Sequence, residues 1–110
     1  MTNSAIKLLL VEDHKLMRVG LKSLFEEQDG LEVTSEAENG KEAIEKFRTT
    51  HPDVTLMDIG LPDISGIEAT KRILELNTNA KIIIQNYFIK YPMIIINYML
   101  NLHSLIKWKI

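Results

Sequence analysis

Three carboxylates stand directly after two apolar runs of the sequence. Glu12 and Asp13 follow the run 6–11. Asp58 follows the run 54–57. A single acidic residue after a strand is commonly a turn residue or a helix cap, but three carboxylates at one sheet edge repel one another unless a cation lies between them. Oxygen ligands suit a hard ion, Mg²⁺ best, and a carboxylate beside it could act as a nucleophile toward a phosphoryl group.

The segments around these residues alternate between strand and helix periodicity. Apolar or alternating runs predict four strands, at 6–11, 31–37, 54–57 and 81–85. Apolar residues at helical spacing predict three helices, between 14 and 28, between 39 and 51, and between 65 and 77. Asn39 and Ser65, each with a glutamate three residues later, predict capping boxes. Helices of this length between apolar strands imply right-handed crossovers and a doubly wound, parallel α/β sheet, whose ligands bind beyond the carboxyl ends of the strands.

Length, charge and cysteine content exclude several classes of protein. A chain of 110 residues provides one domain. With 13 basic and 15 acidic side chains, a strongly basic nucleic-acid binder is not expected. The chain has no cysteine, so it has neither a disulfide framework nor a thiol nucleophile. The N-terminus lacks a signal-peptide pattern and no run reaches the roughly 20 apolar residues of a membrane span, so we expect a cytoplasmic protein without a membrane role.

The composition changes near the end of the fourth predicted strand. All 15 acidic residues lie between Glu12 and Glu75, and residues 82–110 contain nine isoleucines and only three charged side chains, all lysines. We therefore divide the chain into a recognisable core, 1–86, and an atypical tail, 87–110, of the same domain. A reading-frame change shortly after Ile84 is one hypothesis for this shift. An uncovered sheet edge at this point would favour self-association.

Two motifs resemble a known family. The stretches L-L-L-V-E-D-H at 8–14 and L-M-D-I-G-L-P-D-I-S-G at 56–66 resemble CheY-like receiver domains of two-component response regulators. The segment 14–24 is most similar to receivers that carry a LuxR-type helix-turn-helix output domain, although we expect no output domain within these 110 residues. The resemblance covers about residues 5–85 and implies a flavodoxin-like sheet in the order 2-1-3-4, with a fifth strand left open.

The resemblance also implies a mechanism and a set of site residues. Asp58 would accept a phosphoryl group from a sensor histidine kinase, in a self-catalysed reaction that makes the chain a signalling protein and no conventional enzyme. Asp13 and Asp58 would bind Mg²⁺ directly, Glu12 would bind it through water, and the backbone carbonyl of Gly60 would be a further ligand.

The sequence departs from the family at the positions that follow the fourth strand. Asn86 stands where the family has Thr or Ser, and only Lys107 and Lys109 lie at about the distance from Asp58 expected of the essential lysine. A degenerate receiver that acts as a non-switching interaction module is therefore the alternative. A small Mg²⁺-dependent phosphohydrolase is a third hypothesis, but it requires a second aspartate where Gly60 stands.

Overall fold

The computed structural model describes residues 5–85, so the tail 87–110 and the predicted switch positions Asn86, Lys107 and Lys109 lie outside the described residues. Within this range, strands and helices alternate: β1 (Ile6–Val11), α1 (Lys15–Glu26), β2 (Leu31–Ala37), α2 (Gly40–Thr50), β3 (Val54–Asp58), α3 (Gly66–Leu76) and β4 (Ile82–Gln85). The predicted strands and helices are confirmed. The third strand is one residue longer than its apolar run and ends on Asp58 itself.

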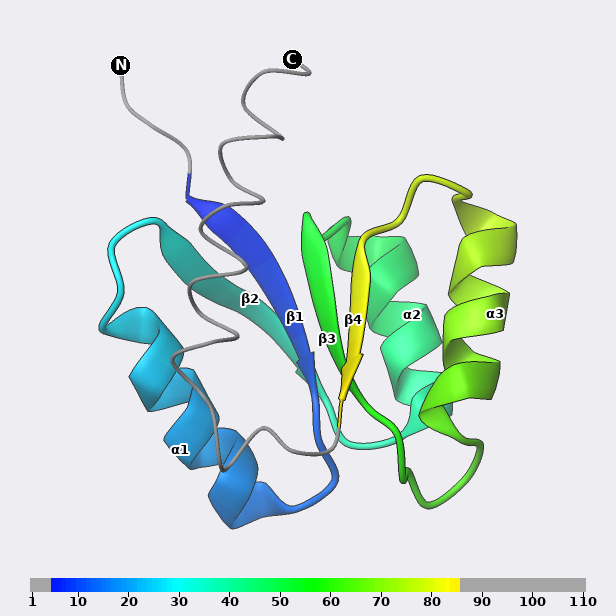
Figure 1. Cartoon of the computed structure of the whole chain (residues 1–110), viewed down its shortest axis with the longest axis horizontal. Helices are drawn as coiled ribbons and strands as arrows, with labels where there is room; N and C mark the ends of the chain where they lie inside the picture. The colour runs from blue at the N-terminus through cyan, green and yellow to red at the C-terminus, as the bar shows by residue number, and fades with distance from the viewer. Residues whose placement is uncertain (1–4, 86–110) are drawn as a thin grey trace.

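The strands form one parallel sheet in the order β2-β1-β3-β4. Helix α1 lies on one face of this sheet, and helices α2 and α3 lie on the other (Figure 1). The chain therefore winds outward from β1 to β2 and then returns across the opposite face to β3. This is the predicted doubly wound, flavodoxin-like arrangement, and the winding direction switches between β1 and β3.

The alternation of side chains along β1 divides the core into two clusters. Leu8 and Leu10 pack with Phe25 of α1, whereas Leu9 and Val11 pack with residues of α2 and α3. Because both faces are covered, these four strand residues are at most 1% exposed, which explains why the run from Leu8 to Val11 is continuously apolar, whereas Lys7 near the start of the strand is exposed. Strand β2 has a wetter face, as predicted, and among the described strands it pairs only with β1.

Side-chain caps fix where α2 and α3 begin. The Oδ1 atom of Asn39 accepts a hydrogen bond from the backbone N–H of Glu42 at 2.8 Å, and Ser65 Oγ accepts one from Glu68 at 3.0 Å. The second bond of a capping box, from the N–H of the capping residue to the glutamate carboxylate, is replaced in both helices. The Glu42 carboxylate accepts from the N–H of Glu38, and the Glu68 carboxylate pairs with an arginine of its own helix. None of the helices within 5–85 has the length and hydropathy that a bilayer span requires.

Candidate metal centre

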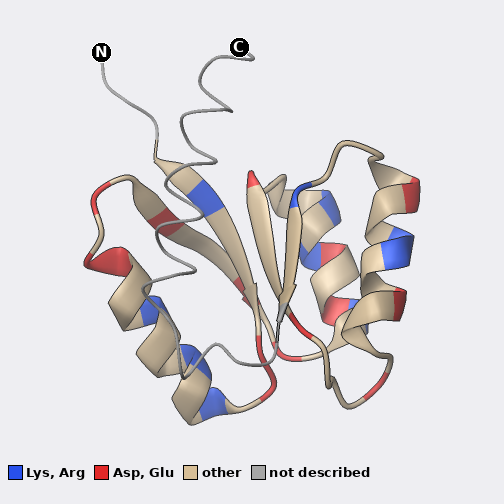
Figure 2. Cartoon of the chain, in the orientation of Figure 1, with Lys and Arg blue, Asp and Glu red and all other residues tan. Residues whose placement is uncertain are grey.

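The winding of the sheet brings the predicted carboxylates together at one edge. Val11 and Met57 are register partners at the ends of β1 and β3, so the residues that follow them emerge side by side. The ligand atoms of a group of four residues lie within 4.8 Å of one another: Glu12, Asp13, His14 and Asp58. Figure 2 shows acidic residues on the turn after β1 and at the end of β3. The predicted convergence at this edge therefore agrees with the structure, and the ligand roles stay predictions.

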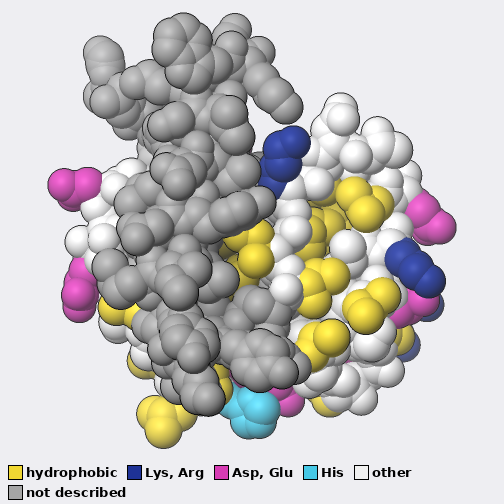
Figure 3. Space-filling model, in the orientation of Figure 1, with side chains coloured by type: hydrophobic (Ala, Val, Ile, Leu, Met, Phe, Trp, Pro, Cys, Tyr) yellow, Lys and Arg dark blue, Asp and Glu magenta, His cyan; other side chains and the backbone are white. Residues whose placement is uncertain are grey.

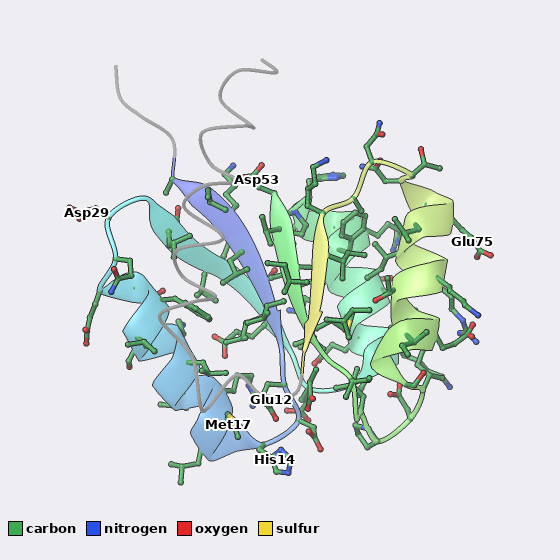
Figure 4. The ribbon with its side chains drawn as sticks, viewed as in Figure 1. Glu12, His14, Met17, Asp29, Asp53 and Glu75 are labelled. Carbon is green, nitrogen blue, oxygen red and sulfur yellow. The ribbon has the colours of Figure 1, made fainter. Side chains whose placement is uncertain are left out.

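His14 contacts both carboxylates of the acidic pair. Its Nδ1 atom lies 2.8 Å from Glu12 Oε2 and 3.2 Å from Asp13 Oδ1. The hydrogen bond to Glu12, followed by the charges of Asp13 and Glu12, raises the pKa of His14. Glu12 is buried, whereas the imidazole is exposed, and both side chains project at the lower end of β1 in Figure 4. The space-filling view shows a histidine at this edge with acidic side chains beside it (Figure 3).

The environment of Asp58 disfavours its ionised form. Burial, and next the charge of Glu12, raises the pKa of Asp58, and Asp13 adds to this effect. The N–H of Gly60, 3.4 Å from Asp58 Oδ1, and the nearby His14 act in the opposite direction. Burial and the charges of the neighbouring carboxylates together outweigh the available donors, a balance that a bound cation would reverse.

One oxygen of this group marks where a cation fits. Asp13 Oδ1 is buried and accepts no hydrogen bond, although the Nδ1 atom of His14 lies 3.2 Å away. A buried acceptor without a donor is costly unless an ion or a water satisfies it. The other possible metal ligands of the group include carboxylate oxygens of Glu12 and Asp58, the type of ligand that Mg²⁺ prefers. The residues present therefore fit a magnesium ion.

Helix α3 begins against the end of β3, and Gly66 makes this possible. A Cβ atom at Gly66 would overlap the carbonyl oxygen of Asp58 and approach the backbone of Ile59. The N–H of Gly66 donates to the carbonyl of Ile59 at 2.9 Å. The glycine of the motif therefore closes the loop 59–65 so that Gly60, which is exposed, remains beside Asp58.

Arg18 of α1 anchors the acidic turn through a hydrogen bond and ion pairs, a role that the sequence did not predict. Its guanidinium donates to the carbonyl of Glu12 at 2.6 Å and lies 3.5 Å from carboxylate oxygens of both Glu36 and Glu38. The side chain is only 12% exposed. Its partners come from two separate segments, the turn after β1 and the end of β2, so spacing along the chain contained no signal for this network. His14 did carry a signal, its place directly after the acidic pair.

Comparisons with known proteins agree with this fold. A family model described as the response regulator receiver domain matches residues 8–107. The chain therefore belongs to the receiver domains of two-component response regulators. The response regulator GacA of Pseudomonas syringae pv. syringae is 41% identical over 78 residues, 71% of this chain and 36% of GacA. The chain spans 36% to 64% of the lengths of three curated relatives.

Two solved structures show the same fold. A LuxR-family two-component response regulator from Aurantimonas sp. SI85-9A1 aligns with a TM-score of 0.71 and 40% identity, over 74% of this chain and 58% of that one. The response regulator TrrA from Thermotoga maritima, solved in complex with Mg²⁺ and BeF, aligns with a TM-score of 0.68 and 34% identity, over 84% of this chain and 78% of that one.

Proposed function

We propose that this chain is a Mg²⁺-dependent phosphoacceptor whose Asp58 receives a phosphoryl group from a sensor histidine kinase, and that this phosphorylation switches its interactions with a partner or output domain. The observation that carries the proposal is the buried Oδ1 of Asp13, which accepts no hydrogen bond and lies within a cluster of carboxylates that includes Asp58. The similarity to TrrA, solved with Mg²⁺ and BeF, supports it. As for response regulators in general, we expect a cytoplasmic location and no metabolite as substrate.

Four groups of the chain would bind the ion, three of them directly and one through water. Asp13 and Asp58 would bind it directly, Glu12 would bind it through water, and the Gly60 carbonyl would complete the protein ligands. When bound, Mg²⁺ supplies positive charge that shields the phosphoryl oxygens from the carboxylates. It would also oppose the pKa rise of Asp58 described above, which keeps the nucleophile ionised.

In the transfer step, the Asp58 carboxylate attacks a phosphoryl group whose leaving group lies in line with it. A carboxylate oxygen forms a bond to phosphorus while the bond from phosphorus to the imidazole nitrogen of the kinase breaks, and its electron pair stays on that nitrogen. Attack by water on the phosphorus of the aspartyl phosphate then breaks the new O–P bond. This second step returns the carboxylate of Asp58 and releases inorganic phosphate.

Intact-mass measurement after incubation with acetyl phosphate tests the proposal directly. We expect one added phosphoryl mass in the parent with Mg²⁺, and none in Asp58→Asn or in the parent with excess chelator. Asp29→Asn, which removes a carboxylate far from the acidic cluster in Figure 4, is the matched control and should behave as the parent does. The proposal is overturned if parent and Asp58→Asn both stay unmodified while circular dichroism shows both to be folded.

The sequence favours one second candidate, a degenerate receiver that binds a partner without switching. It rests on Asn86, which occupies the position of a family Thr or Ser. Under this hypothesis the parent either takes up no phosphoryl group or binds its partner equally well before and after phosphorylation. Replacing Asn86 with threonine would then restore a response to acetyl phosphate in the binding measurement.

A further inference from the structure

The loop between β3 and α3 is joined to the start of α2 by one side chain, Asp63. Its Oδ1 accepts a hydrogen bond from the backbone N–H of Gly40 at 2.7 Å, and its Oδ2 accepts one from Lys41 at 2.9 Å. These N–H groups have no partner within the helix, and the helix dipole favours an anion at this end. Burial works against ionisation, but the N–H donors of Lys41 and Gly40 outweigh it and lower the pKa of Asp63 to about 2.

The packing beside Asp63 reinforces this junction. Gly40 and Ile64 are in such close contact that a Cβ atom at Gly40 would overlap Ile64 Cγ1. Ile64 also packs against the core cluster under α2 and α3. The loop and the start of α2 lie at the same end of the sheet as the acidic group (Figure 1). The far end of the loop is closed by the hydrogen bond from Gly66 to Ile59, so the segment that contains Gly60 is held on both sides.

Capping of α2 does not by itself account for Asp63. Asn39, the residue directly before the helix, already caps it through the N–H of Glu42. Asp63 comes from more than 20 residues away in the sequence and bonds the two preceding N–H groups. The first cap is local, whereas the second joins two segments that are far apart in the sequence.

We propose that Asp63 is a positioning residue, which fixes the loop 59–65 against α2 so that the backbone of Gly60 stands in place for Mg²⁺ before the ion binds. This inference rests on the proposed function and deepens it. A loop ordered during folding binds its ligand more tightly, because the ordering cost is not deducted from the binding free energy. Coupling between two sites is reciprocal, so the bound ion must strengthen the bonds from Asp63 to α2 by the same factor.

Magnesium affinity, measured by calorimetry without any phosphoryl donor, tests this role. Asp63→Asn keeps the side-chain volume but turns an amide N–H toward one of the two helix N–H donors. We expect the Mg²⁺ dissociation constant to rise about tenfold, because that factor corresponds to the entropy of freeing one or two backbone residues. Two control variants should stay within about twofold of the parent. Asn39→Ala removes the local cap of the same helix, and Glu68→Gln removes one negative charge at the same end of the sheet.

Hydrogen exchange in the parent tests the reciprocal half without any substitution. Saturating Mg²⁺ should slow exchange of the Gly40 and Lys41 amides about tenfold, the same factor by linkage. The Glu42 amide, which bonds to Asn39 instead, should change little. This measurement also decides the question if Asp63→Asn does not fold.

The outcomes separate the two proposals. If the parent binds no Mg²⁺, the proposed function fails together with this inference. If the parent binds Mg²⁺ but Asp63→Asn binds it equally well, or the two amides do not respond, only the positioning role is overturned. If Asn39→Ala loses as much Mg²⁺ affinity as Asp63→Asn does, the effect of Asp63 comes from general helix stability and the positioning role is overturned. If Glu68→Gln loses as much, the effect comes from the negative charge of Asp63 and the positioning role is likewise overturned.

Discussion

Removing the carboxylate of Asp58 should make the metal-free protein more stable. Asparagine has nearly the same volume as aspartate, so the substitution mainly deletes one negative charge from a group whose ligand atoms lie within 4.8 Å of one another. In the parent, burial and the charges of Glu12 and Asp13 disfavour the ionised form of Asp58. Asp58→Asn relieves that repulsion in the folded state and has little effect on the unfolded chain.

The separation of the carboxylates sets the size of the effect. Two unit charges 4.8 Å apart repel by about 0.9 kcal/mol in water and by about 3.5 kcal/mol at an effective dielectric constant of 20. Asp58 is only half-buried, so solvent screens much of this repulsion. The N–H of Gly60 and the nearby His14 offset a further part. We therefore expect a gain of about 1–2 kcal/mol in the free energy of unfolding.

Urea denaturation with excess chelator at pH 7 and low salt measures this gain. Asp29→Asn makes the same change in net charge at an exposed site far from the acidic group, and it should stay within about 0.5 kcal/mol of the parent. With Mg²⁺ at about a hundred times its dissociation constant, the parent should gain about 2.7 kcal/mol and become the more stable protein. If Asp58→Asn is no more stable than the parent in chelator, the inferred carboxylate repulsion is wrong.

The pH dependence of this stability difference follows from the sign of the pKa shift. The folded-state pKa of Asp58 is raised above its ordinary value of 3.8, so the penalty is absent below that value and grows as the pH rises through the folded pKa. The gap between Asp58→Asn and the parent should therefore close as the pH falls from 7 toward 4. Repeating the urea titrations at several pH values checks this, and a gap that widens on acidification would contradict the sign.

Two further substitution pairs test the packing that supports the site. Gly66→Ala should lower the free energy of unfolding by about 3 kcal/mol or more, because its Cβ would overlap the Asp58 carbonyl. Gly20→Ala, whose Cβ would meet nothing within 4 Å in helix α1, should raise it by about 0.5–1 kcal/mol. Thermal denaturation of both variants measures the difference. Arg18→Ala should lower the free energy of unfolding by about 1–3 kcal/mol, because it leaves the Glu12 carbonyl without its donor. Lys22→Ala removes a more exposed ion pair and should lower it by less than about 1 kcal/mol. Equal costs within either pair would show that the named contact is not responsible.

The elements themselves were largely predictable because their signals are local. Each strand within 5–85 has its own apolar or alternating run, and the caps at Asn39 and Ser65 lie beside the helices they start. Residues 86–110 break these patterns, and the roles predicted for Asn86, Lys107 and Lys109 stay predictions. The reciprocal halves of the capping boxes were predicted wrongly, because a glutamate at the third helical position can choose among several nearby donors.

The sequence by itself determined the α/β class and the placement of Glu12, Asp13 and Asp58 at the ends of strands. These features depend on periodicity and on where an apolar run stops, and a single chain carries both in its order of residues. Only the tertiary structure decided that Arg18 supports the acidic turn and that Asp63 ties the loop to another helix. Hydrogen bonds of that kind depend on how helices are rotated and how loops close, which follows from the packing of the whole sheet and from no local pattern.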